Sequence, residues 1–386
     1  MSGIVLSAAV RQNLLSLQDT AALLSTTQNR LATGNKVNSA LDNPTNFFTA
    51  QGLNNRASDI NNLLDSIGNG VQVLQAANTG ITSLQKLVDT AKSIANQVLQ
   101  APTGYTAKST STSSVLLGTS ANLVDGADIK ATDVLDIAAT SGGTATHIVF
   151  GASESLAQLN TALAANNLTA SLDSGNHLVI TTTNDAISST VTPTFTPTGG
   201  GTATFGAGTA PVADPASQAI RASLVGQYNN IITQITTTAQ DSSFNGINLL
   251  NGDNLKLTFD ETAKSTLNVA GVTYNATGLG LTSLVSGTDF LDNNSANAQL
   301  TKLNSASTTL RTEASALGSN LSVVQLRQDF NKSLINVLQT GASNLTLADP
   351  NEEAANSQAL STRQSIAVSA LALANQSQQS VLQLLR

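Results

Sequence analysis

The sequence contains no cysteine and no tryptophan, and only 3% of its 386 residues are aromatic. Without cysteine the chain has no disulfide framework, no thiolate metal site and no thiol nucleophile. With so few aromatic side chains, compact cores must be built from Leu, Ile, Val and Ala, which suits long helix seams better than a large globular enzyme core. Only 11% of the residues are charged, and the uncharged polar residues that replace them can be buried against copies of the same surface at low desolvation cost.

Three further absences exclude other classes of protein. The formal net charge of −7 argues against a nucleic-acid binder, which normally carries a basic patch. No apolar run approaches the ~18 residues of a membrane-spanning helix. The first residues lack a basic stretch followed by a full apolar stretch, so we expect no cleaved signal peptide, and any export must use another route.

The positions of the prolines divide the chain. Residues 45–101 and 216–349 contain none, as long uninterrupted helices require. Between Pro102 and Pro215 the composition changes to Ser, Thr, Gly and short β-branched runs, and residues 101–215 hold two lysines against eight acids, a net charge of −6. The sequence therefore predicts a separate, acidic, solvent-facing insert at 101–215.

Both ends of the chain carry apolar residues at alternating spacings of three and four. Such a series keeps one apolar seam along a helix, and the seam requires a partner helix. The two end helices have only each other within one chain, so we expect their seams to pack against neighbouring subunits. The residues predicted for this subunit interface are Leu14, Leu17, Leu24, Leu31, Ala367, Leu371, Ala374, Val381, Leu384 and Leu385.

The strongest helical pattern runs from residue 296 to 338 in an unbroken four-three register. Its expected partners are residues 57–100 and a helix across about 216–239, which together form a rigid bundle within one chain. The tripeptide Asn78-Thr79-Gly80 interrupts the apolar series of residues 57–100 and is expected to mark a local irregularity in that seam.

Short strands are predicted between and beyond these helices. Alternating polar and apolar residues at 254–259 and 266–270 predict a β-hairpin near 254–275. In the insert, residues 147–150 and 177–181 are typical of strands, with one short helix between them, and 187–214 is predicted to be extended loop or edge strands. The predicted fold class is thus mainly α with an α+β insert: a long antiparallel coiled-coil bundle formed by both termini, a β-hairpin in the helical spoke, and an outer mixed β-rich domain.

No catalytic, cofactor-binding or metal-binding constellation is found in the sequence. The two histidines, His147 and His177, each begin a strand-like run and are interpreted as surface residues, because a metal site needs three or four ligands. Asp349 is predicted to cap the final helix, with Glu352 and Glu353 in its first turn, where they favour the helix dipole. We therefore expect a structural protein and not an enzyme.

Four motifs in order make the chain resemble bacterial flagellin. Residues 30–44 (RLATGNKVNSALDNP) are similar to the family's signature between its innermost helix and the next, and residues 243–252 (SFNGINLLNG) to its Phe-Asn-Gly turn. Leu279-Gly280-Leu281 matches the turn after the hairpin, and the ending VLQLLR matches the family's C-terminus. Together these motifs cover residues 1–100 and about 216–386.

The resemblance implies an arrangement and a set of partners. Residues 1–43 and 346–386 would be the inner-tube terminal helices, 44–100 and 216–345 the helical spoke, and 101–215 the variable outer domain. The implied partners are copies of the chain itself, hook-associated and cap proteins, and the flagellar export apparatus with its chaperone. The terminal seams would remain disordered until neighbours bury them, and the filament would lie outside the cell.

Two features depart from the common family pattern. The insert precedes the Phe-Asn-Gly turn, whereas many flagellins carry their outer domains after the hairpin; part of it, about 134–183, resembles a small β-α-β-β repeat of flagellins and hook-associated proteins. In the stretch that animal toll-like receptors recognise, the usual Arg and Glu are replaced by Thr90 and Ser93, so we expect weak or no recognition.

Two alternatives remain beside the filament subunit. A hook–filament junction protein shares the terminal motifs, although its members usually depart more from the Phe-Asn-Gly and Leu-Leu-Arg patterns. A coiled-coil adhesin would need a membrane anchor or signal peptide, neither of which is evident in the sequence.

Overall fold

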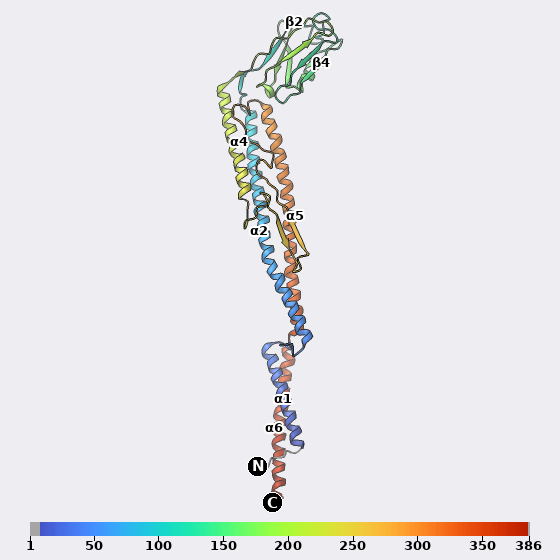
Figure 1. Ribbon diagram of the computed structural model, residues 1–386, viewed down its shortest axis with the longest axis vertical. Helices are drawn as coiled ribbons and strands as arrows, with labels where there is room; N and C mark the ends of the chain where they lie inside the picture. Colours follow the sequence, from blue (N-terminus) through green and yellow to red (C-terminus); the bar gives the residue numbers. More distant parts are fainter. Residues whose placement is uncertain (1–7, 385–386) are drawn as a thin grey trace. The chain divides into compact units, whose positions relative to one another are not determined.

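The computed structural model describes residues 8–384. The chain forms two compact units, the first made of residues up to 69, 257–267 and those from 324 onward, the second of 70–256 and 268–323. The helices α2 (Pro44–Gln100) and α5 (Asn293–Thr346) each contribute to both units (Figure 1).

The predicted fold class is confirmed, because long helices dominate and a β-rich segment separates them. The other helices are α1 (Ala8–Thr33), α3 (Leu156–Ala164), α4 (Pro215–Asp241) and α6 (Pro350–Leu384), with one 3₁₀ turn at Asn184–Ala186. The strands are β1 (Tyr105–Ala107), β2 (Thr110–Leu116), β3 (Val134–Ile137), β4 (Thr146–Val149), β5 (Leu168–Leu172), β6 (His177–Thr182), β7 (Pro193–Thr196), β8 (Val212–Ala213), β9 (Leu255–Thr258) and β10 (Thr266–Val269).

In the first unit, α2 and α5 meet along a short apolar core. Ala57 and Ile60 of α2 pack with Ile335 and Leu338 of α5, and the last three belong to the apolar series that predicts the helix seams. The loop between β9 and β10 lies against the same part of α5, where the buried Asn331 donates from Nδ2 to the carbonyl of Phe259 at 3.0 Å. This buried amide replaces an apolar seam residue, and its partner explains why a polar group is tolerated there.

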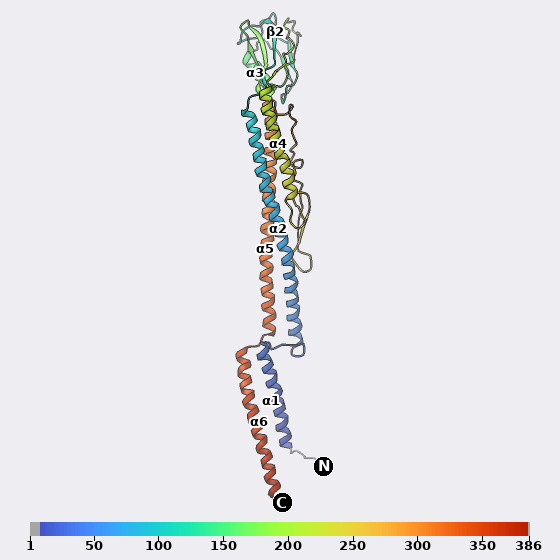
Figure 2. The ribbon, with the colours of Figure 1, turned by 90° about the vertical axis from the view of Figure 1, so that its left-hand side faces the viewer.

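In the second unit, α2, α4 and α5 form the helical bundle that the proline-free segments predict (Figure 2). α2 runs without interruption through Asn78-Thr79-Gly80, so the expected irregularity is not a break in the helix. A Cβ atom on Gly80 would lie only 2.7 Å from a Leu250 methyl carbon. The glycine is therefore needed because the chain that follows α4 approaches the helix closely at this point. The buried faces of the three helices include Leu74, Ile81, Leu84, Val88, Tyr228, Ile232, Ile235, Leu303, Leu310 and Leu317.

A fully buried arginine joins three chain segments at one end of this bundle. Arg221 of α4 donates to the carbonyl oxygens of Val98, Ala101, Pro102 and Phe290 at 2.6 to 3.1 Å, and to Asn293 Oδ1 at 3.4 Å. The carbonyls at the end of α2 have no partner within that helix, so the guanidinium acts as its C-terminal cap. Burial lowers the pKa of Arg221, and the nearby Asp292 carboxylate opposes this effect.

The Phe-Asn-Gly motif forms a tight two-residue turn. Phe244 and Ile247 exchange both backbone hydrogen bonds at 3.0 Å, and Asn245 (φ 49°) and Gly246 (φ 80°) occupy the left-handed region between them. Asn and Gly are the residues that this turn type favours. The next residue, Asn248, holds the end of α4, because its Nδ2 donates to the carbonyls of Ala239 and Gln240 at 2.8 Å.

The insert contains two three-stranded antiparallel sheets, ordered β2-β6-β5 and β4-β3-β7, with α3 between β4 and β5. The strands at 147–150 and 177–181 and the short helix are confirmed, and β4-α3-β5-β6 has the β-α-β-β order. β1 pairs with β8, which brings the two ends of the insert together. Ser188 of the insert donates to Asp292 Oδ2 at 2.6 Å, just before α5. The shared core includes Leu123, Ile129, Leu135, Phe150, Leu159, Leu163, Leu178 and Ile180.

Candidate assembly interface on the terminal helices

The two terminal helices pack on one another. α1 and α6 lie side by side and antiparallel in both views (Figures 1 and 2). On α1 the most buried residues are Val10, Thr20 and Thr27, with Leu17 and Leu24 half-buried between them. The seam thus uses Thr20 and Thr27 and not their neighbours Ala21 and Gln28, which the apolar series places there.

Thr20 fits its seam position for a chemical reason. The hydroxyl of Thr20 donates to the carbonyl of Ser16 at 2.7 Å, so the buried oxygen has a partner within its own turn. The methyl group is then left to pack against α6. A search for apolar residues alone misses threonine, because its hydroxyl places it among the polar residues although its methyl group can be buried.

The residues predicted for the subunit interface occupy the seam only in part. Leu14 is 37% exposed and Leu31 is 43% exposed. Five others are half-buried between α1 and α6: Leu17, Leu24, Ala367, Leu371 and Ala374. Val381 and Leu384 belong to α6 but their side chains fall outside the described part of the structure, and Leu385 lies outside the described residues. Their role in subunit contacts stays a prediction.

A second apolar surface on the same helices was not predicted from the sequence. The pairs of adjacent leucines at 14–15 and 23–24 could have indicated this second surface. Only one leucine of each pair can lie on the seam, so the other must lie on a different face of the helix. The large apolar side chains at least half exposed on α1 and α6 are Leu15 (59%), Leu23 (54%), Ile366 (65%), Val368 (51%) and Leu373 (70%). A single chain thus leaves several large apolar side chains of these two helices uncovered, which is typical of an interaction surface.

The loop after α1 is built around a glycine and an aspartate. Gly34 ends the helix in the left-handed region (φ 70°), and the backbone then bridges to the segment before α6 through Asn35 and Leu347. Asp42 Oδ2 accepts from the backbone N–H groups of Asn38 and Ser39 at 2.9 and 2.8 Å. These bonds, chiefly the one from Ser39, lower the pKa of Asp42.

The same loop prepares the start of α2. Asn43 Oδ1 accepts from the backbone N–H of Asn46 at 3.0 Å, and Pro44 is the first helical residue, where its missing N–H costs nothing. Residues 30–44 therefore consist of a helix end, an aspartate-closed turn and a helix cap, which account for Gly34, Asp42, Asn43 and Pro44.

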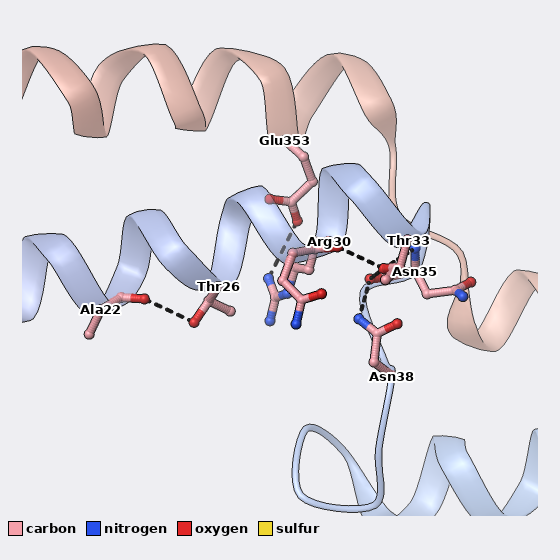
Figure 3. A network of polar contacts seen from close by, with 8 residues as sticks. Ala22, Thr26, Arg30, Thr33, Asn35, Asn38 and Glu353 are labelled. Atoms are coloured by element: carbon pink, nitrogen blue, oxygen red, sulfur yellow. Dashed lines mark hydrogen bonds and ion pairs between the residues drawn. The ribbon is translucent and has the colours of Figure 1, made fainter.

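The start of α6 is fixed to the end of α1 (Figure 3). Asp349 Oδ1 accepts from the backbone N–H of Asn351 at 2.9 Å, so the predicted cap is confirmed. Glu353 does more than favour the helix dipole, because it reaches from α6 toward α1 and pairs with Arg30 Nη1 at 3.4 Å (Figure 3). The sequence could not reveal this pair, whose members are 323 residues apart.

Possible chemical sites elsewhere have ordinary explanations. His147 and His177 lie on β4 and β6, and their Nδ1 atoms contact Asp136 at 2.6 Å and Asp173 at 3.3 Å, respectively. Among the described residues, no three metal-ligating side chains gather in one place. None of the described helices combines the length and the apolar character needed to cross a membrane.

Comparison with known proteins assigns the family. The model of the bacterial flagellin N-terminal helical region matches residues 5–116, and that of the bacterial flagellin C-terminal helical region matches residues 300–385. Similar proteins include flagellins FljM and FljK of Caulobacter vibrioides, 32% and 30% identical over 164 residues, which is 42% of this chain and 59% of each relative. Flagellin A of Rhizobium meliloti is 37% identical over 89 residues, 23% of each chain.

The matched regions contain α1, most of α5, α6 and the whole of α2, and together they make up just over half of the chain. The alignment spans less than two thirds of the length of the Caulobacter relatives. Both helical regions occur in their expected order at the two ends of the sequence, and the chain belongs to the bacterial flagellin family.

Proposed function

We propose that this chain is a structural subunit of a bacterial flagellar filament and that it polymerises through α1 and α6. The observation that carries the proposal is the uncovered apolar surface of these two helices. Leu15, Leu23, Ile366 and Leu373 are all at least half exposed in a single chain. Each such side chain gains roughly 1.5–3 kcal/mol when it is fully buried, so packing against neighbouring copies supplies a strong drive for assembly.

The composition supports a polymer of identical subunits. Within the described part of α1 and α6, one ion pair joins the two helices, between Arg30 and Glu353. Elsewhere the faces are mostly Ser, Thr, Asn, Gln and Ala, and burying such groups costs less than burying charges. A contact between different surfaces of successive copies propagates as a helical tube instead of closing into a ring.

The predicted domain roles are part of the same proposal. Residues 1–43 and 346–386 would form the inner tube, 44–100 and 216–345 the spoke, and 101–215 the exposed surface domain. The filament would be extracellular and would serve motility. The hook-associated, cap and export proteins would be its partners, and toll-like receptor recognition would be weak or absent because Thr90 and Ser93 replace the usual charged residues. We assign no enzymatic activity to the chain.

The test is electron microscopy of the purified protein with matched truncations. The intact chain is expected to form long filaments, and removal of residues 1–40 or 347–386 is expected to abolish them. Filaments of unchanged yield from either truncated form would contradict the proposal.

A deletion in the insert serves as the control for these truncations. The backbone N–H of Asp214 donates to the carbonyl of Gly104 at 2.9 Å, so the two ends of the insert are adjacent and can be joined directly. Deleting about 105–212 removes more than twice as many residues as either truncation, yet it is expected to spare assembly. Loss of filaments in this variant would place subunit contacts in the insert.

A further inference from the structure

The segment just before α5 is fixed firmly to the bundle of the second unit. Phe290 is fully buried, and its ring packs edge-on against that of Tyr228 of α4, with 5.8 Å between the ring centres. The backbone of Phe290 lies in the left-handed region (φ 62°), which a residue with a large side chain adopts only where its surroundings impose it. Arg221 contributes to this constraint, because it donates to the carbonyl of Phe290 at 2.6 Å and to Asn293 Oδ1 at 3.4 Å. A group that contacts residues 290–294 therefore contacts a rigid base.

The insert contacts this base through two side chains. Asp292 is only 3% exposed; its Oδ1 accepts from the backbone N–H of Ser295 at 2.8 Å and caps α5, and its Oδ2 accepts from Ser188 of the insert at 2.6 Å. Asn294 lies against Gly142, because a Cβ atom on that glycine would come within 2.1 Å of the Asn294 amide group. Gly142 lies between β3 and β4, and Ser188 lies between β6 and β7, so the base holds the insert at two separate loops.

The two loops are also joined to each other. The backbone N–H of Ser141 donates to Ser189 Oγ at 2.8 Å, and Asn167 Nδ2, just before β5, donates to the carbonyl of Ser141 at 2.9 Å. Ala186 and Ile187, which precede Ser188, are both buried. The loops can therefore move only together with the sheets to which they belong.

The polypeptide connections alone would hold the insert loosely. β1 and β8 pair through Tyr105 with Ala213 and through Ala107 with Val212, and all of these residues except Tyr105 are exposed. A two-stranded ribbon of this length is marginally stable in water. An insert attached by such a ribbon alone would take many orientations, and the contacts at residues 290–294 oppose this freedom.

We propose that residues 290–294 form a rigid joint that holds the insert in one orientation on the bundle, with the hydrogen bond from Ser188 to Asp292 as its main contact. Because Asp292 is buried, separation of the two would leave a carboxylate oxygen without its donor until water entered, which favours the docked orientation. The insert is then a fixed extension of the bundle. In a filament, whose formation rests on the proposed function, the inserts would follow the same symmetry as the helices that carry them.

The test is a distance measurement between two spin labels by pulsed electron paramagnetic resonance. The chain contains no cysteine, so Ala162→Cys on α3 and Asn304→Cys on α5 place one label on the insert and one on the bundle. Both positions are exposed. The labelled chain with no other change is expected to give one narrow distance distribution. The protein is kept below the concentration needed for polymerisation, so the result does not depend on the proposed function.

Variants of the labelled chain test which contacts form the joint. Ser188→Ala removes the donor to Asp292 Oδ2 and should raise the population of other orientations about tenfold, because a hydrogen bond to a charged group is lost. Ser188→Ala combined with Asn294→Ala removes both side-chain contacts and should give a broad distribution. Ser188→Thr keeps the hydroxyl and should leave the distribution narrow. The matched control is Thr190→Ala, which removes an exposed hydroxyl two residues farther along and should change nothing.

Amide hydrogen exchange in β3 and β6 checks that the sheets of the insert stay folded in each variant. A broad distribution in the labelled chain with no other change would refute the joint, and so would a narrow one in the double variant. Equal broadening in Thr190→Ala would show that the contact with Asp292 is not the cause. Loss of protection in β3 and β6 of Ser188→Ala would show that Ser188 stabilises the insert itself and not its attachment, which would also overturn the proposal. Failure of the unlabelled chain to form filaments would refute the proposed function and leave the distance result as it stands.

Discussion

Replacing Arg221 with alanine should destabilise the second unit more than any other single loss of a charged side chain in the bundle. The substitution leaves the carbonyls of Val98, Ala101, Pro102 and Phe290 without their donor. Each unsatisfied buried carbonyl costs about 1–3 kcal/mol, although water that enters the vacated space recovers part of this. We expect a net loss of about 3–5 kcal/mol in the free energy of unfolding, as for other buried charged groups that lose one partner.

Lysine at the same position tests the geometry of the interaction. Its ammonium group carries three donors in one place, whereas the guanidinium reaches five acceptors that belong to the end of α2, the segment before α5 and Asn293. Arg221→Lys should therefore lose about 2 kcal/mol, an intermediate value. The matched control is Arg311→Ala, because Arg311 is exposed on α5 and its side chain forms no hydrogen bond or ion pair with the residues that the structure describes. Its expected loss is within about 0.5 kcal/mol.

The assay is urea unfolding followed by far-ultraviolet circular dichroism, at a concentration below that needed for polymerisation. Amide hydrogen exchange of residues 98–104 and 290–293 adds local resolution, and protection there should fall first in Arg221→Ala. An alanine variant as stable as the Arg311→Ala control would refute the reasoning, since the buried carbonyls would then have found other donors.

Three further predictions concern other contacts. Asp42→Ala should speed amide exchange at 38–39 several-fold without loss of overall helix content, because both backbone N–H groups lose the carboxylate that accepts from them. These bonds lower the pKa of Asp42 below 3.8. In the unchanged protein, amide exchange at 38–39 should therefore become faster as the pH falls below 3.8 and should stay slow above it. The three tyrosines all have raised pKa values, Tyr228 to about 12 by burial, so absorbance at 295 nm should show little tyrosinate near pH 10 in the native protein and about half in urea. The contribution of Tyr228 to stability, about 3 kcal/mol, is present below pH 10 and lost as the pH rises through 12. Asn331→Leu should cost about 1–3 kcal/mol and expose the β9–β10 loop to exchange, because the Phe259 carbonyl loses its donor.

The long helices were predictable because their spacing of apolar residues and their lack of proline act over many residues. The seam of α5 from Leu303 to Leu338 needs no information about its partner. The Phe-Asn-Gly turn and the cap at Asp349 were equally accessible, since each depends on a few adjacent residues whose conformational preferences are strong.

The insert was predicted less completely because its sheets do not depend on apolar alternation alone. The strand β2 reads TSTSSVL, and two of its inward positions are serines. Ser111 donates to the carbonyl of Gly206 at 2.7 Å, and the backbone N–H of Leu178 donates to Ser113 Oγ at 2.9 Å. A strand whose buried side chains are satisfied by hydrogen bonds to distant segments gives no periodic apolar signal.

The assembly surface shows a different limit of sequence reasoning. An apolar heptad pattern predicts that a helix packs against at least one other helix. It does not predict how many helices contact each face. In the structure the pairing of α1 with α6 leaves Leu14 and Leu31 more than one third exposed, although both belong to the predicted seam. Only the three-dimensional arrangement separates the face that α6 covers from the face that remains for neighbouring copies.

The specific polar contacts between α1 and α6 are concentrated at the end where the loop segments join them. There the backbone bridge of Asn35 with Leu347, the cap at Asp349 and the pair of Arg30 with Glu353 all lie within about two helical turns. Farther along, the described seam residues are the buried Val10 and Thr20 with half-buried leucines and alanines, whose packing fixes the register less strongly than paired polar groups do. The joined end thus sets the antiparallel register of the pair, and the remaining length stays able to accommodate the helices of adjacent copies.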